Sequence, residues 1–181
     1  DEIREVEERN RRSNEEMKKA VREVEKDIER VAREIRKRAE EVSKRNEDIN
    51  REIRKTLRDK KKLTDILRES KELNRKLEEL VKRIKDELDK LLEDLRREVR
   101  KIEEESKRTN EDLKKKAKDG TSDETLRRVI RKSEELLKRL KDRLDEVRKR
   151  VEEILKRAEE RLREVIKRSE ELLEEVKRES D

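Results

Sequence analysis

The chain has 181 residues, of which 62% are charged and 27% are hydrophobic, and its formal net charge is +6. It contains no Cys, His, Phe, Tyr, Trp, Pro or Gln, while Gly and Met occur once each. Without Cys and His, the sequence offers no disulfide, no soft zinc ligands and no His- or Cys-based hydrolytic centre. It also lacks a Gly-rich phosphate loop, so we expect neither an enzyme nor a bound cofactor or metal.

Acidic and basic residues are interleaved along the sequence. Glu134 and Glu135 precede Lys138 and Arg139 by four positions, the spacing at which opposite charges meet on one face of a helix. Basic runs such as 60–62 and 114–116 are too short for a nucleic-acid surface. No segment approaches the roughly 18 consecutive apolar residues of a membrane span. We therefore expect neither a nucleic-acid nor a membrane partner and no targeting segment, and the localisation stays open.

The first segment is predicted to be one helix over about 2–58. Its apolar residues recur every 18 positions, which is five turns of an α-helix with 3.6 residues per turn. One line of such residues runs Ile3, Val21, Ala39, Leu57, and a second runs Val6, Val24, Val42. Three further lines include polar members: Asn10, Ile28, Asn46, then Ser13, Val31, Ile49, and finally Asn14, Ala32, Asn50.

A turn is predicted over about 59–63, where basic residues accumulate but neither Gly nor Pro is present. Thr64 followed by Asp65 is typical of a helix start, with an N-cap hydroxyl and an acidic first turn. We therefore expect the second helix to cover about 64–118. Its 18-residue lines also include polar members, namely Ser70, Leu88, Ser106, then Asn74, Leu92, Asn110, and Leu73, Leu91, Thr109.

The second turn is predicted over about 119–122. Gly120, the only glycine, suits the left-handed position that follows a helix end. Thr121 and Glu124 match a capping box, and Ser122 is the alternative cap. The third helix should cover about 123–179, with the same 18-residue lines. Examples are Leu126, Leu144, Leu162 and Ser133, Val151, Ser169.

The polar members match in height when the three helices are folded antiparallel. The midpoint of Asn10 and Asn14 lies as far before residue 60 as that of Ser106 and Asn110 lies after it. Ser133 mirrors this second pair across the turn at Gly120. We therefore predict two buried polar layers. Layer one holds Asn10, Ser13, Asn14, Ser106, Thr109, Asn110 and Ser133, and layer two holds Asn46, Asn50, Ser70, Asn74 and Ser169.

Amides and hydroxyls both donate and accept hydrogen bonds, so each layer can satisfy its own polar groups. Such layers favour one register, because a slipped helix would set Asn against Leu. They lower stability relative to apolar residues. The denaturant midpoint should therefore rise when apolar residues together replace Asn10, Asn14, Ser106, Asn110 and Ser133. Two alternatives stay open: these residues could lie at the edge of the core and face water, or they could line a polar ligand pocket.

The periodicity also predicts how the helices twist. A strict seven-residue step through Val151 and Ile154 brings Arg161 and Arg168 into the core, and an 11-residue step from Leu126 reaches Arg148. Neither supercoil fits, so the helices should be nearly straight. The predicted fold is all-α, a single-chain antiparallel three-helix bundle over 1–181.

With this periodicity, the matched polar layers and the missing residue types, the sequence resembles de novo, parametrically designed helical bundles. The resemblance covers the whole chain and implies high stability, no evolved activity and no functional residues. The expected role is a structural scaffold, with a monomer favoured and no partner required. One alternative is a helical interaction module that forms a homo-oligomer through an open apolar stripe; a natural spectrin-like rod is another.

Overall fold

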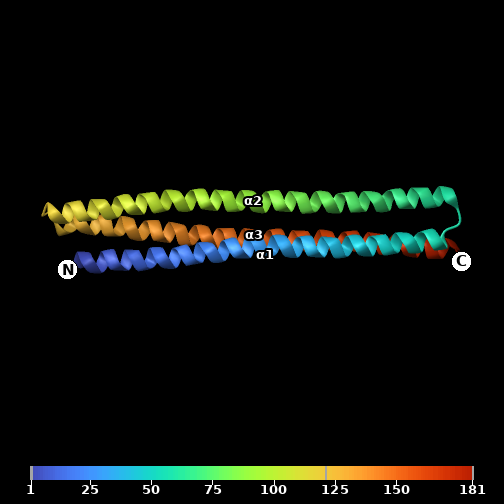
Figure 1. Cartoon of the computed structure of the whole chain (residues 1–181), viewed down its shortest axis with the longest axis horizontal. Coiled ribbons are helices and arrows are strands. Elements are labelled where there is room, and N and C mark those ends of the chain that lie inside the picture. The colour runs from blue at the N-terminus through green and yellow to red at the C-terminus, as the bar shows by residue number, and fades with distance from the viewer. Residues whose placement is uncertain (1, 121, 181) are drawn as a thin grey trace. The chain divides into compact units, whose positions relative to one another are not determined.

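The computed structural model describes residues 2–120 and 122–180, and it consists of three long helices (Figure 1). α1 covers Glu2–Thr56, α2 covers Lys60–Lys118 and α3 covers Asp123–Ser180. No strand occurs in the described ranges. The protein is an all-α three-helix bundle, as its periodicity predicts.

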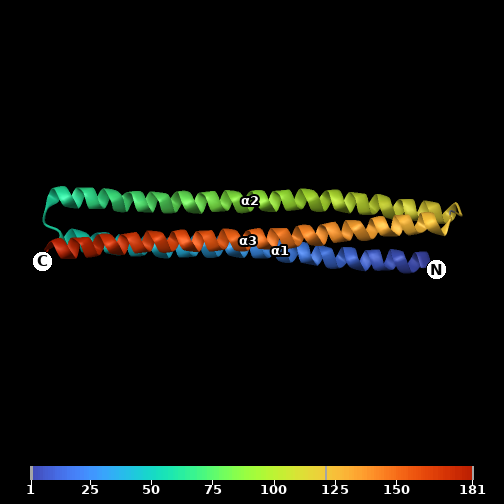
Figure 2. The same ribbon diagram turned by 180° about the vertical axis from the view of Figure 1, so that it is seen from behind.

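The chain divides into two compact units, and each unit contains a segment of every helix. Unit 1 comprises Asp1–Ile28 and Asp89–Arg150, and unit 2 comprises Glu29–Leu88 and Val151–Asp181. In the colours of Figure 1, unit 1 holds the blue start of α1, the yellow end of α2 and the orange start of α3. Unit 2 holds the cyan end of α1, the green start of α2 and the red end of α3, which Figure 2 shows from behind.

Contacts between helices show that consecutive helices run antiparallel within each unit. In unit 1, α1 meets α2 through the pairs Asn10–Asn110 and Glu25–Arg96, and α2 meets α3 through Glu105–Arg139 and Glu98–Arg143. In unit 2, the corresponding pairs are Asn46–Asn74 for α1 and α2, and Glu87–Arg157, Glu69–Arg168 and Lys62–Glu179 for α2 and α3. Residue numbers rise on one helix as they fall on the other. This is the predicted topology.

Burial follows the 18-residue spacing. Val21, Ala39 and Leu57 of the first line are all buried, as are Val24 and Val42 of the second. The predicted members Ile3 and Val6 lie outside the residues whose side chains the structure describes. In unit 2, one apolar cluster joins all three helices: Ile49, Ile53, Leu57, Leu73, Leu172, Leu173 and Val176. Among the described residues, no large hydrophobic side chain is exposed.

The first turn differs from the prediction, because α2 begins at Lys60 and not near Thr64. The Asp59 carbonyl accepts the first helical hydrogen bond from the Leu63 amide over 3.0 Å. The Asp59 side chain accepts one from the Lys61 amide, also over 3.0 Å. Asp59 is therefore the N-cap. Thr64 lies inside α2, where its hydroxyl donates to the Lys60 carbonyl over 2.8 Å.

The capping carboxylate explains why the basic residues around position 60 do not prevent a helix from starting there. The first turn of α2 contains no acidic residue, and its lysines lie at the positive end of the helix dipole. The negatively charged carboxylate of Asp59 lies at that same end, where it accepts a hydrogen bond from an amide that would otherwise have no partner. The predicted Thr64-Asp65 start is wrong because Asp59 offers an earlier cap.

The second turn has the predicted glycine. Gly120 has φ of 67°, a conformation that glycine adopts without the steric cost a Cβ brings. The Ser122 carbonyl accepts the first helical bond of α3 from the Leu126 amide over 3.2 Å, so Ser122 is the backbone N-cap. Its hydroxyl lies 3.0 Å from that of Thr125. Thr121, the first half of the predicted capping box, lies outside the described residues.

Candidate functional site

Layer two lies entirely within unit 2, and it joins α1 to α2 by side-chain hydrogen bonds. The Asn46 amide nitrogen donates to the Asn74 amide oxygen over 3.0 Å. The Ser70 hydroxyl donates to the Asn50 amide oxygen. Asn46 is fully buried and Ser70 is nearly so, whereas Asn50 and Asn74 are half-buried. Each of these amides therefore has at least one of its polar atoms in a hydrogen bond, and burying such an atom without a partner would destabilise the fold.

Ser169 of α3 completes the predicted set but takes no part in those two bonds. It is buried, with 1% of its surface exposed, and its hydroxyl has no hydrogen-bond partner. The amide oxygen of Asn46 is likewise buried without a partner. Each such group loses its hydration without recovering a hydrogen bond, which costs about 1–3 kcal/mol. Layer two is therefore partly satisfied, and its unsatisfied atoms lie on α1 and α3.

Layer one lies within unit 1 and is joined by fewer hydrogen bonds. The Asn10 amide donates to the Asn110 amide oxygen over 3.3 Å, which is longer than the usual 2.9–3.0 Å. Asn10, Ser106 and Ser133 are buried, whereas Asn110 and Asn14 are half-buried.

Among the described hydrogen bonds, only the one between Asn10 and Asn110 joins two helices in layer one, and two of the other predicted members turn away from the layer. The Thr109 hydroxyl is buried but donates to the Glu105 carbonyl of its own helix over 2.8 Å, a common way for Thr to satisfy itself inside a helix. Ser13 is half-buried and lies in a shallow surface hollow with charged neighbours on α1, including Glu16. Neither side chain contributes a bond between helices in layer one.

The 36-residue offset makes the two layers directly comparable. Asn14 and Ser106 correspond to Asn50 and Ser70. The latter pair is hydrogen-bonded, but no hydrogen bond joins Asn14 to Ser106 among the described contacts. Both of those residues line a cavity of about 620 Å³ in unit 1. The sequence differs beside these pairs at two positions, because Ser13 and Thr109 of layer one correspond to Ile49 and Leu73 in unit 2.

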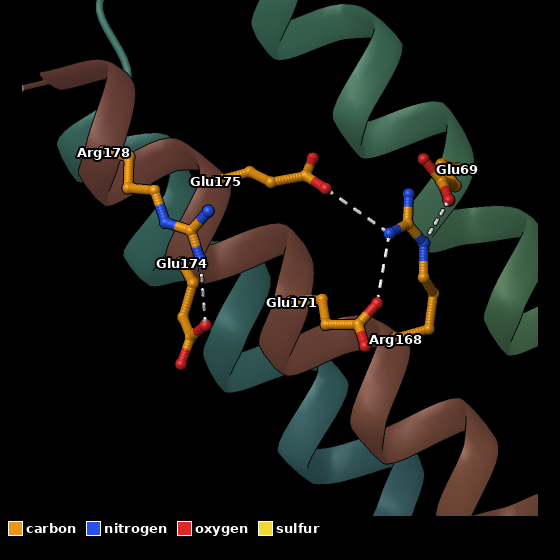
Figure 3. A network of polar contacts seen from close by, with 6 residues as sticks. All are labelled: Glu69, Arg168, Glu171, Glu174, Glu175 and Arg178. Carbon is orange, nitrogen blue, oxygen red and sulfur yellow. Dashed lines mark hydrogen bonds and ion pairs between the residues drawn. The ribbon is translucent and has the colours of Figure 1, made fainter.

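A surface cluster of charges adjoins layer two, centred on Arg168 (Figure 3). The Arg168 guanidinium lies 2.7 Å from Glu69 of α2, and 3.3 Å and 3.5 Å from Glu171 and Glu175 of its own helix. The hydrogen bond with Glu69 raises the pKa of Arg168 above its ordinary value, partly offset by desolvation. Arg168 directly precedes Ser169 and Glu69 directly precedes Ser70. The ion pair therefore links α2 and α3 beside layer two.

This cluster was not predicted from the sequence, although its residues flank layer members in both helices. The corresponding positions in unit 1 are Glu105 and Lys132. There Glu105 pairs with Arg139 instead, over 3.8 Å. The charges beside the two layers thus differ, while the Asn and Ser residues common to both layers repeat.

No group of three or more acidic residues in the described ranges is arranged to hold a metal ion. Within the same ranges, none of the helices combines the length and the apolar character that crossing a membrane requires. Comparisons of the chain with protein-family models, with curated proteins and with solved structures found no match.

Proposed function

We propose that the chain is a de novo designed structural scaffold without an evolved activity, in which apolar layers provide stability and the two Asn and Ser layers specify register. The observation that carries this proposal is that Asn and Ser residues repeat along the chain and form hydrogen bonds between two helices in unit 2. There Asn46 pairs with Asn74, and Ser70 with Asn50, across two helices. Asn and Ser at matched heights on antiparallel helices are a device for selecting one alignment over its neighbours.

The remaining side chains support a scaffold more than an interface. The large hydrophobic side chains that the structure describes are all buried or partly covered, so they offer no open apolar stripe for a partner. The exposed positions carry mixed charges with many ion pairs at helical spacing, such as Arg97 with Glu93. Such a surface resists association.

Register can be tested with two spin labels. The chain has no cysteine, so cysteines placed at the exposed positions Glu47 and Lys71 are labelled selectively. The parent protein should give one narrow distance distribution by electron paramagnetic resonance. A variant with Leu or Ile at all five positions of layer two should be more stable but give a broader or second distance. A single unchanged distance in that variant would contradict the register role.

Oligomeric state separates the scaffold from a self-associating module. Light scattering should give the monomer mass of 22.3 kDa at all protein concentrations, and the melting temperature should not depend on concentration. A dimer mass, or a melting temperature that rises with protein concentration, would contradict the monomeric scaffold and support the homo-oligomeric interaction module.

A further inference from the structure

A cavity of about 620 Å³ lies in unit 1 and is lined by residues of α1, α2 and α3. This volume falls within the range of about 300–1,000 Å³ typical of small-molecule sites. The polar end of the cavity is formed by Asn14, Ser106 and Asn110 of layer one. Apolar side chains also line it, among them Met17 of α1, Val99 of α2 and Leu137 of α3, and five charged residues border it. The cavity therefore offers amide and hydroxyl groups at one end and an apolar lining, bordered by charged side chains, along its length.

The polar end has unused hydrogen-bonding capacity. In layer two, the equivalent of the Asn14–Ser106 pair is closed by a hydrogen bond between Ser70 and Asn50. In layer one that bond is absent among the described residues, and both side chains border the cavity. Their amide and hydroxyl can donate to an acceptor group placed between them.

The rim of the cavity carries more basic than acidic side chains. Lys18, Arg22 and Lys107 border it, together with Glu25 and Glu103. Glu25 is already paired with Arg96, 3.3 Å away. Within the described part of the chain, the three basic side chains have no acidic partner. With Glu25 paired, the three basic side chains outnumber the one remaining acidic side chain, Glu103, so the rim favours an anion over a cation or a neutral head group.

We propose that this cavity binds the free, monomeric form of a medium-chain alkyl carboxylate. The carboxylate lies at the polar end, accepting hydrogen bonds from Asn14 and Ser106 and attracted by Lys18 and Lys107. The alkyl chain lies along Met17 and the apolar side chains beyond it. From residue 110 to residue 99 of α2 the cavity extends about 16 Å, at about 1.5 Å per residue. A chain of about ten carbons fits that length.

Met17 provides a direct probe, because it is the only methionine of the chain and it lines the cavity. Labelling its methyl group with ¹³C gives a single nuclear magnetic resonance signal. Titration with decanoate below its micelle concentration should shift this signal to saturation. Affinity should rise about fourfold for each added methylene from hexanoate to decanoate, the factor that about 0.8 kcal/mol per buried CH₂ gives. Decanol should bind more weakly than decanoate.

A charge-reversed variant, Lys18→Glu with Lys107→Glu, should weaken decanoate binding at least tenfold. The matched control is Arg54→Glu with Lys71→Glu, which makes the same charge change at the equivalent exposed positions of unit 2. That control should bind like the parent protein. The proposal is overturned if decanoate causes no saturable shift at Met17, or if the control weakens binding as much as the cavity variant. The outcome of this test is independent of whether the chain is a designed scaffold.

Discussion

The side chains of Asn46 and Asn74 are joined by a hydrogen bond of 3.0 Å between α1 and α2. The two residues lie equally far from residue 60 along the sequence, one on either side of the turn. Asn46 has none of its surface exposed, so a shift of one helix along the other would leave its amide against apolar side chains. This bond is therefore the contact through which layer two is best placed to oppose a shift in register.

Replacing Ser169 with Ala should stabilise the protein. The Ser169 hydroxyl is buried without a hydrogen-bond partner, and removing it recovers a desolvation penalty of about 1–3 kcal/mol. Ser43→Ala is the control, because Ser43 is a half-buried serine of α1 whose replacement brings only the better helix propensity of Ala, about 0.5 kcal/mol. Guanidinium denaturation should show a clearly larger gain for Ser169→Ala. Equal gains would mean that the Ser169 hydroxyl is satisfied in solution.

Asp59→Ala should lower the free energy of unfolding by about 0.5–2 kcal/mol, the usual effect of losing an N-cap. The carboxylate of Asp59 accepts a hydrogen bond from the Lys61 amide, and its negative charge offsets the positive charge of the lysines in the first turn. Thr64→Ala should change stability by less than about 0.5 kcal/mol, because Thr64 lies inside the helix. The two variants are compared by denaturant titration. A larger loss of unfolding free energy for Thr64→Ala than for Asp59→Ala would mean that α2 starts at Thr64, as predicted from the sequence.

Gly120→Ala should destabilise the protein by about 1–2 kcal/mol, the cost of the left-handed conformation for a residue with a Cβ. A Cβ at this position would meet no atom within 4 Å, so the loss comes from the backbone and not from a clash. Gly120→Asn should cost less, because Asn tolerates φ of 67° better than Ala does. Thermal unfolding of the three proteins should therefore rank Gly above Asn above Ala. An Ala variant as stable as the parent would contradict a left-handed Gly120.

Arg168→Ala should cost at most about 1 kcal/mol despite the three carboxylates around its guanidinium. Side chains of Arg168 and Glu69 are 38% and 43% exposed, and ion pairs at such positions are weakened by solvent and salt. Denaturation at low and high salt should show that the difference from the parent shrinks as salt is added. A loss of several kcal/mol that salt does not change would make this cluster a buried electrostatic contact.

The sequence was informative where one physical cause dominates. Apolar spacing predicted the three helices, because burying one face is what holds such helices in place. The single glycine predicted the second turn, since few residues other than glycine adopt that conformation readily. The heights of Asn46 and Asn74 followed from counting residues on either side of the first turn.

The sequence was less informative where two local choices compete or where packing decides. Both Asp59 and Thr64 are acceptable caps, and the earlier one is used. Thr109 shares a line with Leu73 but turns its hydroxyl to its own helix. The open pair Asn14 and Ser106 has the same residue types as its closed counterpart in layer two, but Ser13 and Thr109 beside it stand where Ile49 and Leu73 lie in unit 2. Such differences depend on how closely the surrounding side chains pack, which a repeat pattern does not specify.

The most direct test of a register-specifying layer is a double-mutant cycle on Asn46 and Asn74. Asn74→Leu should lower the free energy of unfolding by about 1–3 kcal/mol, because it leaves the buried Asn46 amide without its partner. Asn46→Leu should lower it less, because Asn74 is only half-buried and the unpartnered Asn46 amide oxygen is removed as well. The double variant should be more stable than either single variant and at least as stable as the parent, giving a coupling energy above about 1 kcal/mol. If the two losses simply add, the hydrogen bond between these amides does not hold α1 and α2 in register.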